Sequence, residues 1–199
     1  MSADLDFFFD PVCPWAWITS RWVVNVSEQR DYEVDWRFIS LWILNEENTQ
    51  DWYTPEYRAG HYLGHRGLRI ADQLRIIDPD PDAVGRWYAA LGEALHVAQR
   101  RDEARADNTA FLAEVLTATG FDAKLVVHAD DAAHDEWIRA DTELALSRAG
   151  RDVGTPQVVD RICAAAGSSE DDTGPVGRDG EIARLAEGEP LGSCVLPGK

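Results

Sequence analysis

One cysteine stands where an apolar strand gives way to a helix. Residues 5–9, LDFFF, predict a buried strand, and residues 10–13, DPVC, predict a tight turn. Pro14 suits the first position of a helix, because no backbone N–H is needed there. A thiol at this point faces free N–H groups and the positive end of the helix dipole, which favour the thiolate. We therefore expect the pKa of Cys13 to fall from about 8.5 to between roughly 3.5 and 7.5.

The turn holds only one of the two sulfurs of a Cys-x-x-Cys motif. Residue 16, where the second sulfur would stand, is alanine. Strand, turn and helix start together favour a reactive thiol at Cys13. The alternative is a small core residue, since free cysteines are often buried.

Composition limits the class of protein and its partners. A chain of 199 residues with 45% hydrophobic content predicts one domain, or one domain with an insertion, around a sizeable core. Its formal net charge of −17, from 36 acidic and 19 basic residues, argues against nucleic acid or anionic membranes as partners. We find no secretory signal and no apolar stretch long enough to span a bilayer. Three scattered cysteines do not form a disulfide framework, so we expect a cytoplasmic protein.

Strand and helix patterns alternate at the start of the chain. Residues 14–30 predict a helix and residues 34–39 a second strand, which together give a parallel β-α-β unit. Helical spacing then recurs near 55–77, 82–101, 108–119, 122–129 and 131–149. The expected N-caps are Asp107 or Asn108, Asp122 and Asp131, and the expected C-terminal glycines are Gly120 and Gly150. Residues 153–159, VGTPQVV, lead back to the sheet.

Three segments resemble one known family. Residues 9–22, FDPVCPWAWITSRW, closely match an N-terminal motif of the mycothiol-dependent nitroreductases, in the DsbA-type branch of the thioredoxin-like superfamily. Residues 40–46, SLWILNE, and 152–156, DVGTP, are also similar to family segments. The resemblance covers about residues 5–160. It implies an α/β, thioredoxin-like fold with a large all-helical insertion.

This fold divides the chain into two parts. We expect a thioredoxin-like domain formed by residues 1–48 and 150–199, and a helical insertion formed by residues 49–149. The family has a last hairpin, with paired phenylalanines before Gly-Pro-Val, and a closing helix. Residues 174–176 echo the tripeptide, but the longer segment before them lacks the aromatics. We therefore expect this hairpin to be rebuilt or degraded beyond Arg161.

The resemblance also implies an active site in which Cys13 is the catalytic residue. It implies a cis peptide between Thr155 and Pro156 that faces the sulfur, whereas a plain turn is the alternative. Trp15 is expected to shield the sulfur and stack on a substrate, or to pack in the core. Asn45 and Tyr57 are expected at the mouth of the cleft; otherwise Asn45 is a cap or turn residue and Tyr57 a boundary aromatic. The expected substrate-binding residues are Pro14, Trp15, Asn45, Tyr57, Thr155 and Pro156.

We expect a thiol-dependent oxidoreductase. Cys13 would form a mixed disulfide that a small thiol resolves, because Ala16 leaves no partner sulfur. The resemblance implies mycothiol as this co-substrate, an electron-poor nitroaromatic or a disulfide as acceptor, and no tightly bound cofactor. One alternative is a thiol transferase similar to kappa-type glutathione transferases and hydroxychromene carboxylate isomerases, in which Cys13 only hydrogen-bonds the bound thiol. A non-catalytic binding module is another, and a homodimer is compatible with the sequence.

No metal site is expected. His61 and His65 are spaced i, i+4, but no third ligand at a telling spacing accompanies them, so we interpret them as part of a solvated helix face. The same interpretation applies to the cluster His128, Asp130, Asp131 and His134. Cys163 and Cys194 are interpreted as incidental thiols.

Overall fold

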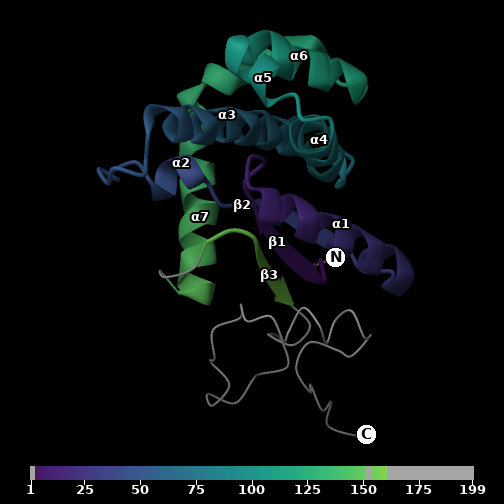
Figure 1. The fold of residues 1–199 in the computed structure, drawn as a ribbon. Coiled ribbons are helices and arrows are strands. Elements are labelled where there is room, and N and C mark those ends of the chain that lie inside the picture. Colours follow the sequence, from purple (N-terminus) through teal and green to yellow (C-terminus); the bar gives the residue numbers. More distant parts are fainter. Residues whose placement is uncertain (1–2, 151–153, 161–199) are drawn as a thin grey trace, which may run out of the picture.

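A mixed sheet lies at the centre of the protein. The computed structural model describes residues 3–150 and 154–160, and within them the strands β1 (Leu5–Phe9), β2 (Val34–Phe38) and β3 (Gln157–Asp160) form one sheet in the order β2-β1-β3 (Figure 1). β1 pairs with β2 in parallel and with β3 in antiparallel register. The parallel pair is connected by helix α1 (Pro14–Arg30), so the predicted β-α-β unit is confirmed.

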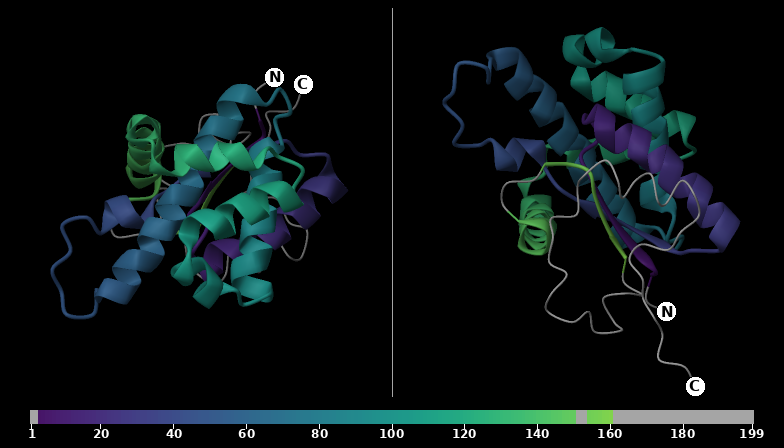
Figure 2. Two further views of the ribbon diagram at one scale, coloured as in Figure 1. Left: turned by 90° about the horizontal axis from the view of Figure 1, so that it is seen from above. Right: turned by 60° about the horizontal axis from the view of Figure 1, so that its bottom comes forward.

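The alternation of side chains along β1 decides which helices cover each face of the sheet. Phe7 and Phe9 point to one face, where the Phe9 ring stacks 4.0 Å from the ring of Tyr88. Phe8 points to the other face and packs with Ala145. Helix α4 (Ala83–Gly92) therefore covers the first face and helix α7 (Asp135–Ala149) the second. Figure 2 shows α7 and α1 on opposite sides of the strands.

Helical elements fill the described chain between β2 and β3. Besides α4 and α7 they are α2 (Leu41–Leu44), α3 (Pro55–Ile77), the π-helical turn η1 (Glu93–Val97), α5 (Arg101–Ala106), α6 (Asn108–Ala118), and the 3-10 helices η2 (Ala123–Asp130) and η3 (Ala132–His134). The helix predicted over 55–77 is confirmed, and that over 108–119 is confirmed to within one residue. Asp107 caps α6, and Gly120 and Gly150 adopt positive φ at helix ends, as predicted.

Two predicted helices are divided by their local backbone. The helix expected over 82–101 ends at Val97, because Gln99 adopts a left-handed φ of 57°, and α5 begins after it. The segment predicted over 122–129 is a 3-10 helix throughout, and the segment over 131–149 begins with a 3-10 turn. There the side chains of Asp122 and Asp131 accept hydrogen bonds from backbone N–H groups two residues ahead. The α-helix of the second segment begins only at Asp135.

The division into a thioredoxin-like domain and a helical insertion stays a prediction. α7, although placed in the insertion, shares a core with β1 through Ala145 and Phe8. The expected fate of the C-terminal hairpin and of Cys163 and Cys194 lies outside the described residues. Within the described chain, no helix combines the length and apolar character that crossing a membrane requires.

Candidate functional site

Cys13 caps the first helix. The turn after β1 closes with a hydrogen bond from Cys13 N to Asp10 O at 3.1 Å, and Cys13 keeps an extended backbone while Pro14 begins α1. The sulfur accepts a hydrogen bond from the N–H of Ala16 at 3.5 Å. The sulfur thus lies at the helix N-terminus, as the sequence predicts.

The loop before β3 reaches the same sulfur. Thr155 and Pro156 are joined by a cis peptide bond, as the resemblance implied. The Cys13 thiol donates a hydrogen bond to the carbonyl oxygen of Thr155 at 3.4 Å. The Thr155 hydroxyl is buried and has no hydrogen-bond partner among the described residues. One loop residue thus gives the thiol an acceptor and also holds a buried hydroxyl that lacks a partner among the described residues.

The predicted fall in the Cys13 pKa is wrong for this structure. Only 6% of Cys13 is exposed, and burial raises the pKa of its thiol above the ordinary value. The negative charge of Asp10 acts in the same direction, while the N–H groups of Ala16 and Trp15 and the hydroxyl of Thr155 oppose it. Desolvation outweighs the effect of the helix N-terminus, and the loop that holds Thr155 contacts the sulfur from a distant part of the chain.

Asp10 is a site residue that the sequence analysis missed. Its carboxylate is fully buried and accepts hydrogen bonds from Val12 N at 3.0 Å and Leu41 N at 2.7 Å. Burial raises the pKa of Asp10 to about 7, although both hydrogen bonds favour the charged form. The one signal in the sequence was an acid three residues before the cysteine, in an otherwise apolar segment.

Helix α3 approaches this carboxylate through a glycine. A Cβ atom at Gly64 would clash with Oδ1 of Asp10 and press against Val12. Only a residue without a side chain lets the helix axis come this close. Gly60, one turn earlier in α3, faces open space instead.

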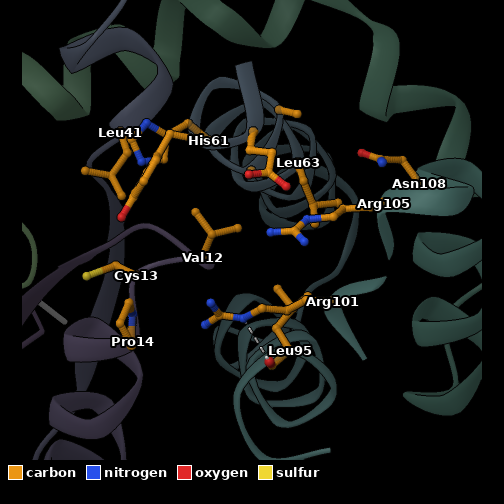
Figure 3. Close-up of a pocket in the computed structure, with 14 residues that line it drawn as sticks. Val12, Cys13, Pro14, Leu41, His61, Leu63, Leu95, Arg101, Arg105 and Asn108 are labelled. Atoms are coloured by element: carbon orange, nitrogen blue, oxygen red, sulfur yellow. Dashed lines mark hydrogen bonds between the residues drawn. The ribbon is translucent and has the colours of Figure 1, made fainter. Parts of the chain in front are cut away.

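A cavity of about 510 Å³ opens beside Cys13. Figure 3 shows Cys13 and Pro14 on one side and the guanidinium groups of Arg101 and Arg105 on the other. The lining comes from the Cys13 turn, α3, α5 and their neighbours: Val12, Cys13, Pro14, Leu41, Glu56, Tyr57, Ala59, Gly60, His61, Leu63, Leu95, Arg101, Arg105 and Asn108. Its size is in the range that holds a small-molecule ligand.

His96 connects the cavity wall to the cysteine turn. Its Nε2 donates to Pro11 O at 2.9 Å, and its Nδ1 accepts from Arg101 at 2.9 Å. A carbonyl only accepts and a guanidinium only donates, so His96 is neutral and its tautomer is fixed. Burial lowers the pKa of His96, which agrees with that state. Within the described chain no carboxylate pairs with Arg101.

The structure brings together some of the predicted site residues and leaves others outside. Cys13, Pro14 and Tyr57 line the cavity, and Thr155 and Pro156 lie at the sulfur. Trp15 is 70% exposed and does not line the cavity.

Asn45 takes the alternative role of a cap residue. Its amide donates to Leu41 O at 2.9 Å at the end of α2, and the side chain does not line the cavity.

The interpretation of His61 and His65 as a solvated face is wrong. His65 is 1% exposed and contacts Ser40 through Nδ1 and Asp135 through Nε2, at 3.1 and 2.9 Å. His61 lines the cavity and contacts the hydroxyl of Tyr53 at 3.2 Å. Helix α3 is buried around much of its circumference, because α2, α4, η2 and α7 all pack on it.

The parallel β-α-β unit, the antiparallel return strand and the helical segment between them define a thioredoxin-like protein of the DsbA type. The chain belongs to the Rv2466c-like family: the family model described as mycothiol-dependent nitroreductase Rv2466c matches residues 12–170. The predicted family is thereby confirmed.

Two known proteins illustrate the similarity. The chain is 32% identical over 152 residues to the uncharacterized protein Rv2286c of Mycobacterium tuberculosis, which covers 76% of this chain and 62% of that protein. The present chain therefore spans less than two thirds of the length of this curated relative. A putative protein disulfide isomerase from Nitrosomonas europaea shares the fold, with a TM-score of 0.59 and 16% identity over 94% of this chain and 97% of that one.

Proposed function

We propose that the protein is a thiol-dependent oxidoreductase that acts through Cys13. The observation that carries this proposal is the position of the sulfur. It caps α1, lies 3.4 Å from Thr155 O and borders a cavity of about 510 Å³. A thiol that is both anchored and open to a ligand-sized cavity suits exchange with a bound thiol or disulfide.

The proposed cycle moves two electrons through one sulfur. The Cys13 thiolate attacks a disulfide acceptor, forms a mixed disulfide and releases the other half of the acceptor as a thiolate. A first small thiol then attacks the sulfur of Cys13 and releases the remaining half of the acceptor as a thiolate. A second small thiol attacks the sulfur of the first, which joins the two as a disulfide and releases the Cys13 thiolate. The acceptor ends as two thiols and the small thiols end joined as a disulfide. Both displacements need thiols from solution, because residue 16 is Ala16.

Mycothiol is the small thiol that family membership supports. The cavity adds a feature of its own, because Arg101 and Arg105 line the wall opposite Cys13. In a chain of net charge −17, two arginines at this wall favour an acceptor that carries an anionic group. A cytoplasmic location and a homodimer stay predictions.

One observation favours the transferase alternative. The Cys13 pKa is raised by burial, and its S–H donates to a carbonyl oxygen. A thiol that stays protonated could hydrogen-bond the sulfur of a bound small thiol, which would then be the nucleophile. In that case Cys13 positions the substrate and forms no covalent bond.

Intact mass after thiol challenge separates the two functions. The protein is prepared as a C163S/C194S variant, so that Cys13 is its one thiol, and is incubated with oxidised mycothiol. The oxidoreductase proposal expects one mycothiol adduct, which reduced mycothiol removes and which Cys13→Ser abolishes. Absence of an adduct contradicts it, and full transferase activity in Cys13→Ser would in addition show that the sulfur of Cys13 is dispensable.

A further inference from the structure

We propose that His128, Asp131 and His134 form a binding site for a borderline divalent cation such as Zn²⁺. The three residues belong to the segment of η2 and η3, and none of them lines the cavity at Cys13. One ligand atom from each lies within 4.8 Å of the others. This proposal revises the sequence-based expectation of no metal and is independent of the proposed function.

The two imidazoles have the separation of a metal-bound pair. Nε2 of His134 lies 3.3 Å from Nδ1 of His128. Two nitrogens held at about 2.0–2.1 Å by one tetrahedral Zn²⁺ are about 3.3 Å apart. The same distance fits a hydrogen bond between the rings, in which His128 Nδ1–H donates to His134. Metal binding would move that proton to the other ring nitrogen of His128 and leave both facing lone pairs free.

A buried carboxylate orients His134 for ligation. Nδ1 of His134 lies 2.7 Å from Oδ2 of Asp72, which is 1% exposed. Because a carboxylate only accepts, Nδ1 carries a proton, and in the neutral ring Nε2 then presents its lone pair toward His128. Arg75 in turn holds Asp72 at 2.6 Å. A histidine whose second nitrogen donates to a carboxylate is the usual support of a metal-ligating imidazole.

The local backbone brings the three side chains together. His128 lies in the last turn of η2, His134 ends η3, and Asp131 joins these two 3-10 helices in an extended conformation with φ −86° and ψ 105°. Hydrogen bonds from Asp131 N to His128 O at 3.1 Å, and from Ala133 N to Oδ1 of Asp131 at 2.9 Å, fix the middle ligand. The other carboxylate oxygen of this exposed residue is open to a cation. The α-helical spacing that the sequence predicts for this segment does not reveal that the three side chains lie together.

The ligand set indicates the class of metal. Two imidazole nitrogens and one carboxylate oxygen suit Zn²⁺, Co²⁺, Ni²⁺ or Cu²⁺, whereas Mg²⁺ and Ca²⁺ prefer oxygen alone. Three protein ligands leave a fourth position for water. A cation here would link η2 and η3 to α3 through His134 and Asp72, and it should stabilise the helical segment by mass action.

Calorimetric titration of chelator-treated, tag-free protein with ZnCl₂ tests the site. We expect one equivalent that binds the wild type, raises its midpoint of thermal unfolding and is lost in His128→Ala. His128 is only partly buried, so this variant keeps most of the packing. His61→Ala, which removes a histidine outside the cluster, should keep the equivalent. Asp72→Asn should weaken binding about 10- to 100-fold if Asp72 positions the ligand.

Other results would overturn the proposal. Zn²⁺ binding that persists in His128→Ala, or that disappears only when the cysteines are replaced, assigns the metal to other groups. No binding to the wild type leaves the cluster as a hydrogen-bonded pair of histidines. A MgCl₂ titration serves as a further control, and equal binding of Mg²⁺ would identify a nonspecific acidic surface.

Discussion

The sulfur of Cys13 and the carbonyl oxygen of Thr155 lie 3.4 Å apart, although 142 residues separate them in the chain. The contact joins the start of α1 to the loop before β3. It buries the thiol and gives its proton an acceptor. The reactivity of the candidate site therefore depends on how far a substrate, or ionisation of nearby groups, can shift this buried thiol toward its thiolate.

The first prediction concerns the ionisation of Cys13. Because burial raises its pKa, the rate of alkylation in the C163S/C194S variant should rise with a midpoint above that of free cysteine, about 8.5. Asp10→Asn removes a negative charge that raises this pKa, so the midpoint should move to lower pH. Glu56→Gln removes a charge elsewhere on the cavity and serves as control. A midpoint unchanged in a folded Asp10→Asn protein would contradict this coupling.

A second prediction links Asp10 to stability. Its pKa is about 7 in the folded protein and about 3.9 when unfolded, so the folded state binds more protons between these values. The unfolding free energy should therefore fall as pH rises from about 4 to 7, by up to a few kcal/mol. Urea unfolding at several pH values measures this contribution as the difference between the wild type and Asp10→Asn.

Three histidines, of which His65 is buried and the other two are half-buried, change stability in the opposite direction and make that comparison necessary. Burial lowers the pKa values of His61, His65 and His96, which favours their neutral forms in the folded state. Their contribution to stability grows as pH rises through their unfolded values, near 6.5. A wild-type pH profile alone would mix the two effects. Parallel profiles of the wild type and Asp10→Asn would contradict the assignment to Asp10.

Two glycines of α3 form a matched pair for the third prediction. Gly64→Ala should destabilise the protein by about 1–3 kcal/mol, because its Cβ would meet the buried Asp10 carboxylate. Gly60→Ala faces open space and should stabilise the helix by up to about 1 kcal/mol. Chemical denaturation of both variants gives the comparison, and equal changes in the two would refute the close approach of α3 to Asp10.

The fourth prediction tests the charge of the cavity and depends on the proposed oxidoreductase activity. Arg101→Ala should raise KM about fivefold for an anionic disulfide such as dithiobis(nitrobenzoate), since an exposed charge pair contributes up to about 1 kcal/mol. Turnover of the neutral bis(hydroxyethyl) disulfide should change little. Arg100→Ala is the control, because Arg100 pairs with Glu103 and Glu114 and does not line the cavity. The same rise in KM for both substrates would show a structural effect instead.

Local patterns in the sequence were sufficient for the framework of the fold. The sequence predicts the β-α-β unit from three signals: the apolar run of β1, the proline after Cys13 and the alternation of β2. Each of these signals depends only on residues that are close together in the sequence. Helix ends at Asp107, Gly120 and Gly150 followed from the same local rules. The family motif supplied the pairing of Cys13 with the Thr155–Pro156 loop, which no local rule could predict.

Only the tertiary structure decided the electrostatics of the site and the partners of its polar groups. The helix N-terminus favours a thiolate at Cys13, but burial under the Thr155 loop opposes it and prevails. Desolvation depends on what packs over a group, and that cover comes from segments far along the chain. The contacts of His134 with Asp72 and of His96 with Pro11 span 62 and 85 residues. Sequence periodicity carries no information over such distances, whereas the folded chain brings these atoms within hydrogen-bonding reach.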